Sequence, residues 1–167
     1  MSKYFSSRSV TAVTIWGFCA GLALSTAAQA STILAGASCA LTKSRVLVVT
    51  GLDGTGSATF STVPKSRISF TTTSKGCVVV RFSAEAESGP SNNYLNIQAV
   101  LDGAIISKPA DTAFAGNGTG SLPLAAHAME YIFANVPAGS HFITVQFRSI
   151  GAGFVQLGNR TTVVQYQ

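Results

Sequence analysis

Apolar and polar residues alternate along most of the chain beyond residue 44, and the segment 77–88 (CVVVRFSAEAES) is the clearest case. Every second residue from Val78 to Ala86 is apolar, and most of the residues between them are polar. A period of two puts the two sets on opposite faces of an extended strand. The segment is therefore expected to be a β-strand with one face in the core and one in solvent.

The same alternation recurs further along the chain. In 94–103 it predicts an inward-facing apolar set, Leu95, Ile97, Ala99 and Leu101. Asp102-Gly103 then favours a tight hairpin turn. The segment 136–139 (VPAG) favours a turn between two more alternating sets. Those sets are Met129, Tyr131 and Phe133 before the turn and Ile143, Val145 and Phe147 after it. Since no segment beyond residue 30 shows helical spacing, we expect an antiparallel β-sandwich or jelly roll of about eight strands.

The first thirty residues have the layout of a secretory signal peptide. Residues 1–9 contain Lys3 and Arg8 but no acidic residue, and residues 10–24 form an uninterrupted run of apolar or small residues. The sequence AQA before Ser31 supplies the small residues that a signal peptidase requires. We expect residues 1–30 to be removed, leaving a single β-sandwich domain, 31–167. A membrane anchor would need roughly 20 apolar residues, so no membrane span is expected after processing.

Cysteine usage agrees with export to the periplasm or the cell exterior. Cys19 lies in the expected signal peptide, which leaves Cys39 and Cys77 in the mature chain. Two thiols in a small exported domain usually pair, because the compartment is oxidising. We therefore predict a Cys39–Cys77 disulfide. A zinc site or a catalytic thiol is disfavoured because no histidine accompanies either cysteine.

The charge balance argues against a nucleic-acid partner. The chain has 11 Lys and Arg against 6 Asp and Glu, and loss of Lys3 and Arg8 with the signal peptide leaves an excess of three. That excess is thin and scattered along the sequence. The carboxylates are equally dispersed, so we assign no catalytic residue, no metal ligand and no cofactor.

Three features suggest chemistry and have simpler explanations. Asp53-Gly54-Thr55-Gly56-Ser57 resembles a D-x-[ST]-x-S magnesium motif, but no helical pattern follows it and a Gly-rich turn between strands explains the same residues. His127 and Glu130 lie three apart, which puts them on opposite faces of a strand. His141 is expected to be a partly exposed residue at the start of a strand.

The loop 89–93 and the residue after it hold the candidate residues for a glycan contact. Carbohydrate-binding sandwiches often present exposed aromatic rings, and the mature chain has no Trp and three Tyr. Tyr94, with Asn92 and Asn93 next to it, is the candidate ligand-binding group. The favoured interpretation of Tyr94 is a tyrosine at the start of a strand that covers the sheet edge, and the glycan contact is the alternative.

The segment Val136 to Gln146 (VPAGSHFITVQ) resembles the hairpin of complement and tumour-necrosis-factor type jelly rolls. Those modules are trimeric, non-catalytic heads. The resemblance implies a homotrimer and transfers no functional residue.

A second resemblance is to chaperone-usher pilin subunits. The chain has two cysteines 38 positions apart and ends in VVQYQ, with Tyr166 penultimate. The resemblance implies that a surface-assembly partner reads the last strand through Thr162, Val164 and Tyr166. Pilins carry a long donor strand before the first cysteine, whereas here only residues 31–38 precede Cys39.

The sequence thus predicts an exported, non-catalytic β-sandwich with a binding or structural role at the bacterial envelope or cell exterior. A pilin-like assembly subunit is the first alternative, and a jelly-roll carbohydrate-active enzyme is the second. The enzyme would need two carboxylates brought into one cleft.

Overall fold

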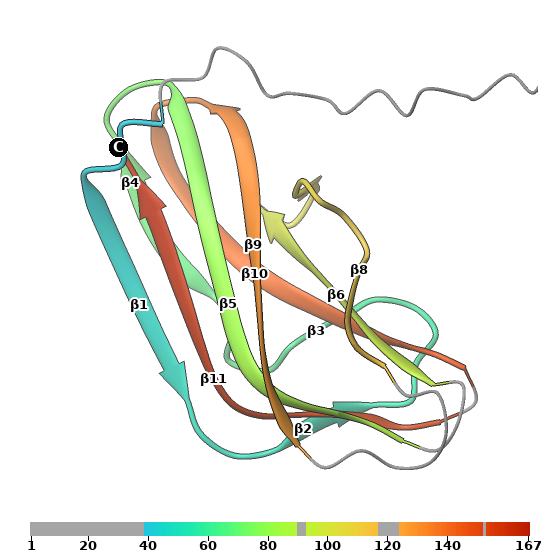
Figure 1. The fold of residues 1–167 in the computed structure, drawn as a ribbon. Helices are drawn as coiled ribbons and strands as arrows, with labels where there is room; N and C mark the ends of the chain where they lie inside the picture. Colours follow the sequence, from blue (N-terminus) through green and yellow to red (C-terminus); the bar gives the residue numbers. More distant parts are fainter. Residues whose placement is uncertain (1–38, 90–92, 117–123, 152) are drawn as a thin grey trace, which may run out of the picture. The chain divides into compact units, whose positions relative to one another are not determined.

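Eleven β-strands and no helix make up the residues that the computed structural model describes, which are 39–89, 93–116, 124–151 and 153–167. The strands form two antiparallel sheets that pack face to face (Figure 1). The predicted all-β sandwich is therefore confirmed. Within these residues there is also no helix long and apolar enough to cross a membrane.

The first sheet has the strand order β1-β11-β5-β9, with β2 also paired to β11. Its strands are β1 (Lys43–Val49), β2 (Asp53–Thr55), β5 (Gly76–Ser88), β9 (Ala125–Val136) and β11 (Val155–Tyr166). The second sheet has the order β3-β10-β6-β7, with β4 paired to β10 and β8 to β6. Its strands are β3 (Ser61–Thr62), β4 (Ile68–Thr72), β6 (Tyr94–Leu101), β7 (Ile105–Ile106), β8 (Thr112–Gly116) and β10 (Gly139–Ile150).

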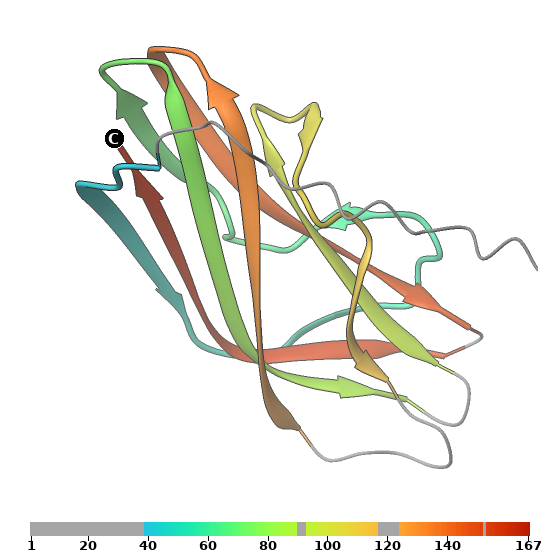
Figure 2. The ribbon, with the colours of Figure 1, turned by 45° about the horizontal axis from the view of Figure 1, so that its top comes forward.

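The eleven strands occupy eight positions. β1 and β2 lie one after the other along β11, β3 and β4 along β10, and β7 and β8 along β6. Each sheet therefore has four positions, and the chain passes between the sheets in the order of a jelly roll (Figure 2). The sequence predicted about eight strands, which is the number of these positions. Three positions each consist of two short strands, and the alternation of residues does not reveal the breaks between them.

The core lies between the sheets and consists of the predicted inward faces. In β5, Val78, Val80 and Phe82 are fully buried, as are Leu95 and Ile97 in β6. The corresponding residues of β9, β10 and β11 complete the same cluster. Packing alternate apolar side chains from both sheets removes them from water, and this hydrophobic effect drives the folding of the sandwich.

One predicted turn is a hairpin and the other is not. Asp102 and Gly103 have φ values of 52° and 76° and join β6 to β7 by a tight turn, as predicted. The segment 136–139 instead carries the chain from β9 in the first sheet to β10 in the second. The predicted turn between the two alternating sets is therefore present, but the strands that it joins lie in different sheets and are not paired as in a hairpin. Alternation reveals which face of a strand is buried, but not which strand lies beside it.

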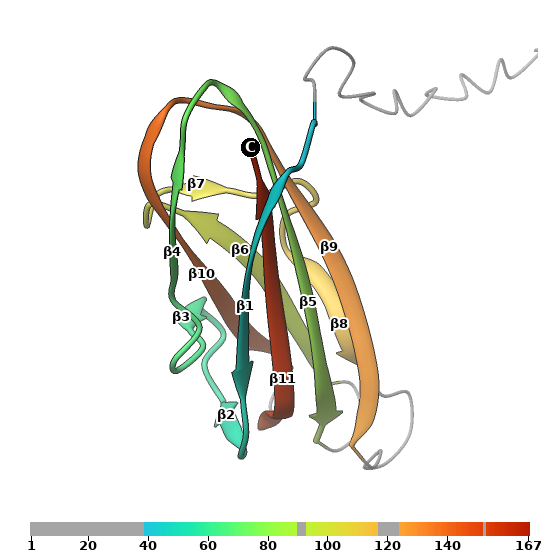
Figure 3. The same ribbon diagram turned by 90° about the vertical axis from the view of Figure 1, so that its left-hand side faces the viewer.

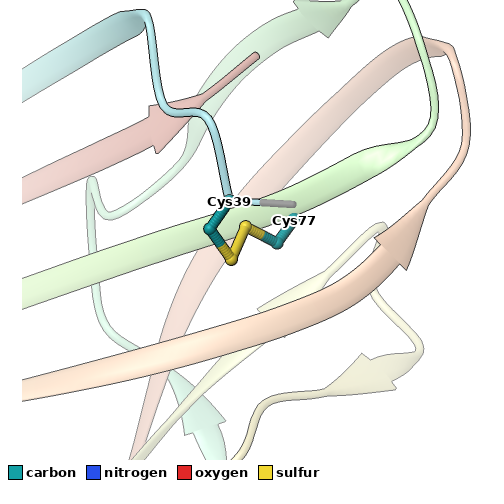
Figure 4. The surroundings of a disulfide bond; sticks show 2 residues. All are labelled: Cys39 and Cys77. Atoms are coloured by element: carbon teal, nitrogen blue, oxygen red, sulfur yellow. A yellow bond between two sulfur atoms is a disulfide. The ribbon is translucent and has the colours of Figure 1, made fainter. Parts of the chain in front are cut away.

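The predicted disulfide is present. Cys39 lies before β1 and Cys77 in β5, with their Cα atoms 5.2 Å apart (Figure 4). The bond ties the start of an edge strand to a central strand of the same sheet.

Candidate functional site

The structure describes two of the three candidate glycan-contact residues, and their side chains have different surroundings. Asn92 lies outside the described residues. Asn93 is buried, where its Oδ1 accepts a hydrogen bond from the Ser149 hydroxyl at 2.7 Å and its Nδ2 donates to the Phe154 carbonyl at 3.2 Å. Tyr94 is 41% exposed and its ring lies against Gly116, so closely that a Cβ on this glycine would meet the ring. Asn93 thus holds a loop together, and Tyr94 covers the neighbouring strand.

The predicted partner-strand face points into the core. Thr162, Val164 and Tyr166 are all buried, and the Tyr166 ring packs 4.9 Å from Phe70. β11 has a neighbour on each side, β1 and β5. These residues are therefore inaccessible to a partner strand in the folded monomer.

Asp53 forms an ion pair in place of the magnesium site that its motif resembles. Its carboxylate accepts a hydrogen bond from Arg160, which is 3% exposed. The same guanidinium donates to the carbonyls of Pro64 at 3.0 Å and Gly158 at 3.2 Å. No group of three or more potential metal ligands occurs in the described part of the chain. Arg160 was not singled out from the sequence because Asp53 and Pro64 lie about a hundred positions away.

His141 is buried, and the expectation of partial exposure is wrong. Its Nδ1 lies 2.8 Å from Asp102 Oδ2 and its Nε2 lies 3.0 Å from the Pro137 carbonyl oxygen. Asp102 Oδ1 also accepts from the Phe142 amide at 2.9 Å. Both partners of the ring are oxygen acceptors. The histidine and its carboxylate thus fasten the β6–β7 turn to β10, and neither ring nitrogen is left to act on a substrate.

His127 and Glu130 lie on opposite faces of β9, as their spacing predicts. The His127 ring packs 5.4 Å from Phe114, whereas Glu130 pairs with Arg81 at 3.0 Å on the outer face.

A pocket of about 590 Å³ lies where the edges of the two sheets meet. β1 is the outermost strand of the first sheet and β4 of the second, and the two strands contact each other (Figure 3). We call this region the β1–β4 edge. The pocket has the size of a small-ligand site. The residues that line it are Arg45, Arg67, Ser69, Phe70, Thr71, Ser140, His141, Phe142 and Tyr166.

The two arginines of the pocket come from different sheets. Arg45 belongs to β1, whereas Arg67 immediately precedes β4 and lies over the ring of Phe142, with 3.6 Å between its Cζ and the ring centroid. Stacking restricts the guanidinium without using its N–H groups, which stay available for a ligand. Neither arginine is ion-paired to a carboxylate of the described residues, which include all six acidic side chains of the chain.

Three other residues that line the pocket are polar and uncharged. The hydroxyls of Ser69, Thr71 and Ser140 can each donate and accept a hydrogen bond. Asp102, which contacts the lining residues His141 and Phe142, is already engaged by both. The arrangement is therefore suited to a ligand that carries negative charge together with hydroxyl groups.

One buried phenol has no role in this pocket. Tyr131 is fully buried between the sheets, and burial raises its pKa, while the nearby Thr112 hydroxyl lowers it in part. Neither hydroxyl makes a well-formed hydrogen bond within the described residues.

Comparisons with known proteins do not assign a family. No family model and no curated protein matches this chain. Among solved structures, a family two carbohydrate esterase from Cellvibrio japonicus matches with a TM-score of 0.27 and 17% identity. The match covers 75% of this chain and 36% of the esterase chain, so this chain spans about a third of that protein.

Proposed function

We propose that the protein is an exported, non-catalytic binding module, and that its ligand is an anion held in the pocket of the β1–β4 edge. The observation that carries the proposal is the pair Arg45 and Arg67. Two guanidinium groups from separate sheets line the same cavity, and neither is neutralised by a carboxylate. A guanidinium binds carboxylate and phosphate groups through strong, often bidentate hydrogen bonds, so two unpaired arginines in a single pocket favour an anionic ligand.

The use of acidic groups elsewhere supports a binding role. Asp53, Asp111 and Glu130 each form an ion pair with an arginine. The Asp102 carboxylate lies 2.8 Å from His141 Nδ1, and Glu85 accepts a hydrogen bond from the Asn159 side chain at 3.1 Å. These carboxylates have structural roles, and the lining of the pocket contains none. A pocket with cations and hydroxyls can bind and orient an anion, and binding is the activity we assign to it.

Affinity electrophoresis of the mature, oxidised protein tests the proposal. The gels would contain polygalacturonate, heparin or polyphosphate, and fully methyl-esterified polygalacturonate would be the neutral control. We expect retardation by at least one of the anionic polymers and none by the neutral one. The double variant Arg45→Gln/Arg67→Gln should lose at least about tenfold in affinity.

Arg81→Gln is the matched control, because Arg81 pairs with Glu130 on the outer face of the first sheet. It removes one positive charge, where the double variant removes two, at a place away from the pocket, and should bind like the parent protein. Absence of binding to all three polymers, or equal loss in both variants, would contradict the proposal.

A homo-oligomeric head is the second candidate, and exposed apolar residues on β1 favour it. Val46 and Val48 point away from the core and are 61% and 64% exposed. Exposed apolar residues on one strand are a feature of subunit contacts. Light scattering coupled to size-exclusion chromatography would show a trimer that Val46→Asp dissociates, whereas a strict monomer would dismiss this candidate.

A further inference from the structure

We infer that the anionic ligand is a linear acidic polysaccharide that runs along the β1–β4 edge beyond the pocket. This inference rests on the proposed function and extends it from a site to a class of ligand. Its basis is the position of the lysines that flank the pocket without lining it.

Positive charge is concentrated on the segment that builds this edge. Residues 39–75 carry five cations, Lys43, Arg45, Lys65, Arg67 and Lys75. The same segment has one carboxylate, Asp53, which is committed to the buried Arg160. None of the five cations forms an ion pair within the described residues. The unbalanced charge of the sandwich therefore lies on one edge.

Elsewhere in the described chain the arginines are neutralised. Arg81, Arg148 and Arg160 pair with Glu130, Asp111 and Asp53. The remaining cation, Lys108, lies at the opposite edge of the sandwich, where its backbone pairs with Ile132 of β9. Charge repulsion across the β1–β4 edge is thus a local feature that a bound anion would relieve.

The cations extend over a distance that a small anion cannot cover. Lys65 and Arg67 precede β4 and Lys75 follows it, and the five residues of β4 alone span about 17 Å in extended conformation. On β1, Lys43 and Arg45 lie two residues apart and face the same side. Only the two arginines line the pocket. A ligand that satisfies all five cations must be a chain with repeated charges.

The chemistry of the lining favours a polysaccharide over a nucleic acid. Single-stranded nucleic acids bind where aromatic rings accept stacked bases beside basic residues. Here the ring of Phe142 is already covered by Arg67, and Phe70 and Tyr166 are buried. The hydroxyls of Ser69, Thr71 and Ser140 offer hydrogen bonds that match sugar hydroxyls instead.

Calorimetry with size-defined oligosaccharides tests the inference. The probes are tri- and hexagalacturonate, trimeric and hexameric heparin-type oligosaccharides, and the oligonucleotide dT12. We expect the longer member of the preferred glycan series to bind at least about tenfold more tightly than the shorter one at low salt, because additional charges engage the lysines. The variant Lys43→Gln/Lys65→Gln/Lys75→Gln should lose this gain and keep the affinity of the short ligand.

Lys108→Gln is the control, since it removes a cation from the opposite edge and should leave both affinities unchanged. Equal affinity for short and long glycans would overturn the inference and leave the pocket proposal intact. Tighter binding of dT12 than of either glycan series would also overturn it, in favour of a nucleic acid. Failure of every anionic probe to bind would instead contradict the proposed function.

Discussion

Arginine occupies two contrasting environments along the boundary between β1 and β11. Arg160 pairs in register with Val49 at the end of β1, is 3% exposed and donates to Asp53 and to backbone carbonyls. Arg45 lies opposite Val164 near the start of the same strand, is exposed and has no carboxylate partner. The first arginine has its charge neutralised within the fold, whereas the second is available to a ligand. The same residue type thus has a structural role at one end of β1 and the binding role that we propose at the other.

The largest expected effect comes from breaking the buried pair. Arg160→Met should lower the free energy of unfolding by about 3–5 kcal/mol, because it leaves Asp53 and three backbone carbonyls without their donor. Urea denaturation followed by circular dichroism measures the change. Arg81→Met, which breaks an exposed pair, should cost only about 0–1 kcal/mol. Equal losses in the two variants would show that the contrast between buried and exposed arginines is wrong.

Loss of the disulfide should have the next largest effect, and it acts on the strand that carries Arg45. The bond closes a loop of 38 positions, so Cys39→Ser/Cys77→Ser should destabilise the fold by roughly 3–4 kcal/mol on the chain-entropy model. Hydrogen exchange should show that β1 is affected more than β11, because β1 is an edge strand. Uniform loss of protection across the first sheet would refute a specific role in anchoring β1.

A smaller loss of stability is expected when the Asp102 carboxylate, which contacts the pocket residues His141 and Phe142, is removed. Asp102→Ala removes acceptors from His141 and from the Phe142 amide, and should cost about 1–3 kcal/mol in thermal or urea unfolding. Asp102→Asn is the matched control: asparagine tolerates the φ of 52° and keeps one acceptor, so it should cost less. If alanine and asparagine were equally tolerated, the His141 contacts would not stabilise the turn.

Tyr131 gives the smallest effect near neutral pH and a characteristic pH dependence. Burial raises its pKa above the usual value of about 10, so the folded state keeps the phenol protonated at pH values at which the unfolded chain ionises it. Stability from this group is therefore complete below pH 10 and declines as the pH rises further, by about 1.4 kcal/mol per unit. Tyr131→Phe should remove this decline, and it should change neutral stability little because the hydroxyl has no well-formed hydrogen bond.

Parallel alkaline profiles of the parent and Tyr131→Phe would mean that the phenol is accessible to solvent. The comparison isolates one group, since Tyr94 and Tyr166 are present in both proteins. Tyr131 would then resemble neither Arg160, whose charge is neutralised inside the fold, nor Arg45, whose charge is available to a ligand.

The sequence predicted which face of a strand is buried, but it did not predict which strands lie side by side. Val78, Val80 and Phe82 are buried because a period of two is a local property that survives folding. Asp102-Gly103 was found for the same reason, since turn chemistry depends on adjacent residues. The crossing at 136–139 was missed because strand pairing depends on residues far away in the chain.

The candidate site was harder to predict because it joins two sheets. Arg45 and Arg67 are 22 positions apart, and they share a pocket only because β1 and β4 are the outer strands on the same side. A local signal was nevertheless present, since residues 39–75 contain five cations and one carboxylate. The net charge of the whole chain concealed this local excess of cations, because the acidic residues outside 39–75 offset the cations outside it.

The most direct test is an NMR titration of the ¹⁵N-labelled protein (residues 31–167) with trigalacturonate and a trimeric heparin-type oligosaccharide, followed by amide shifts. The account predicts that the shifts concentrate in β1, in residues 65–75 and in residues 140–142, and that they disappear in Arg45→Gln/Arg67→Gln. Shifts centred on Tyr94, or on Arg81 and its neighbours on the outer face of the first sheet, would contradict it.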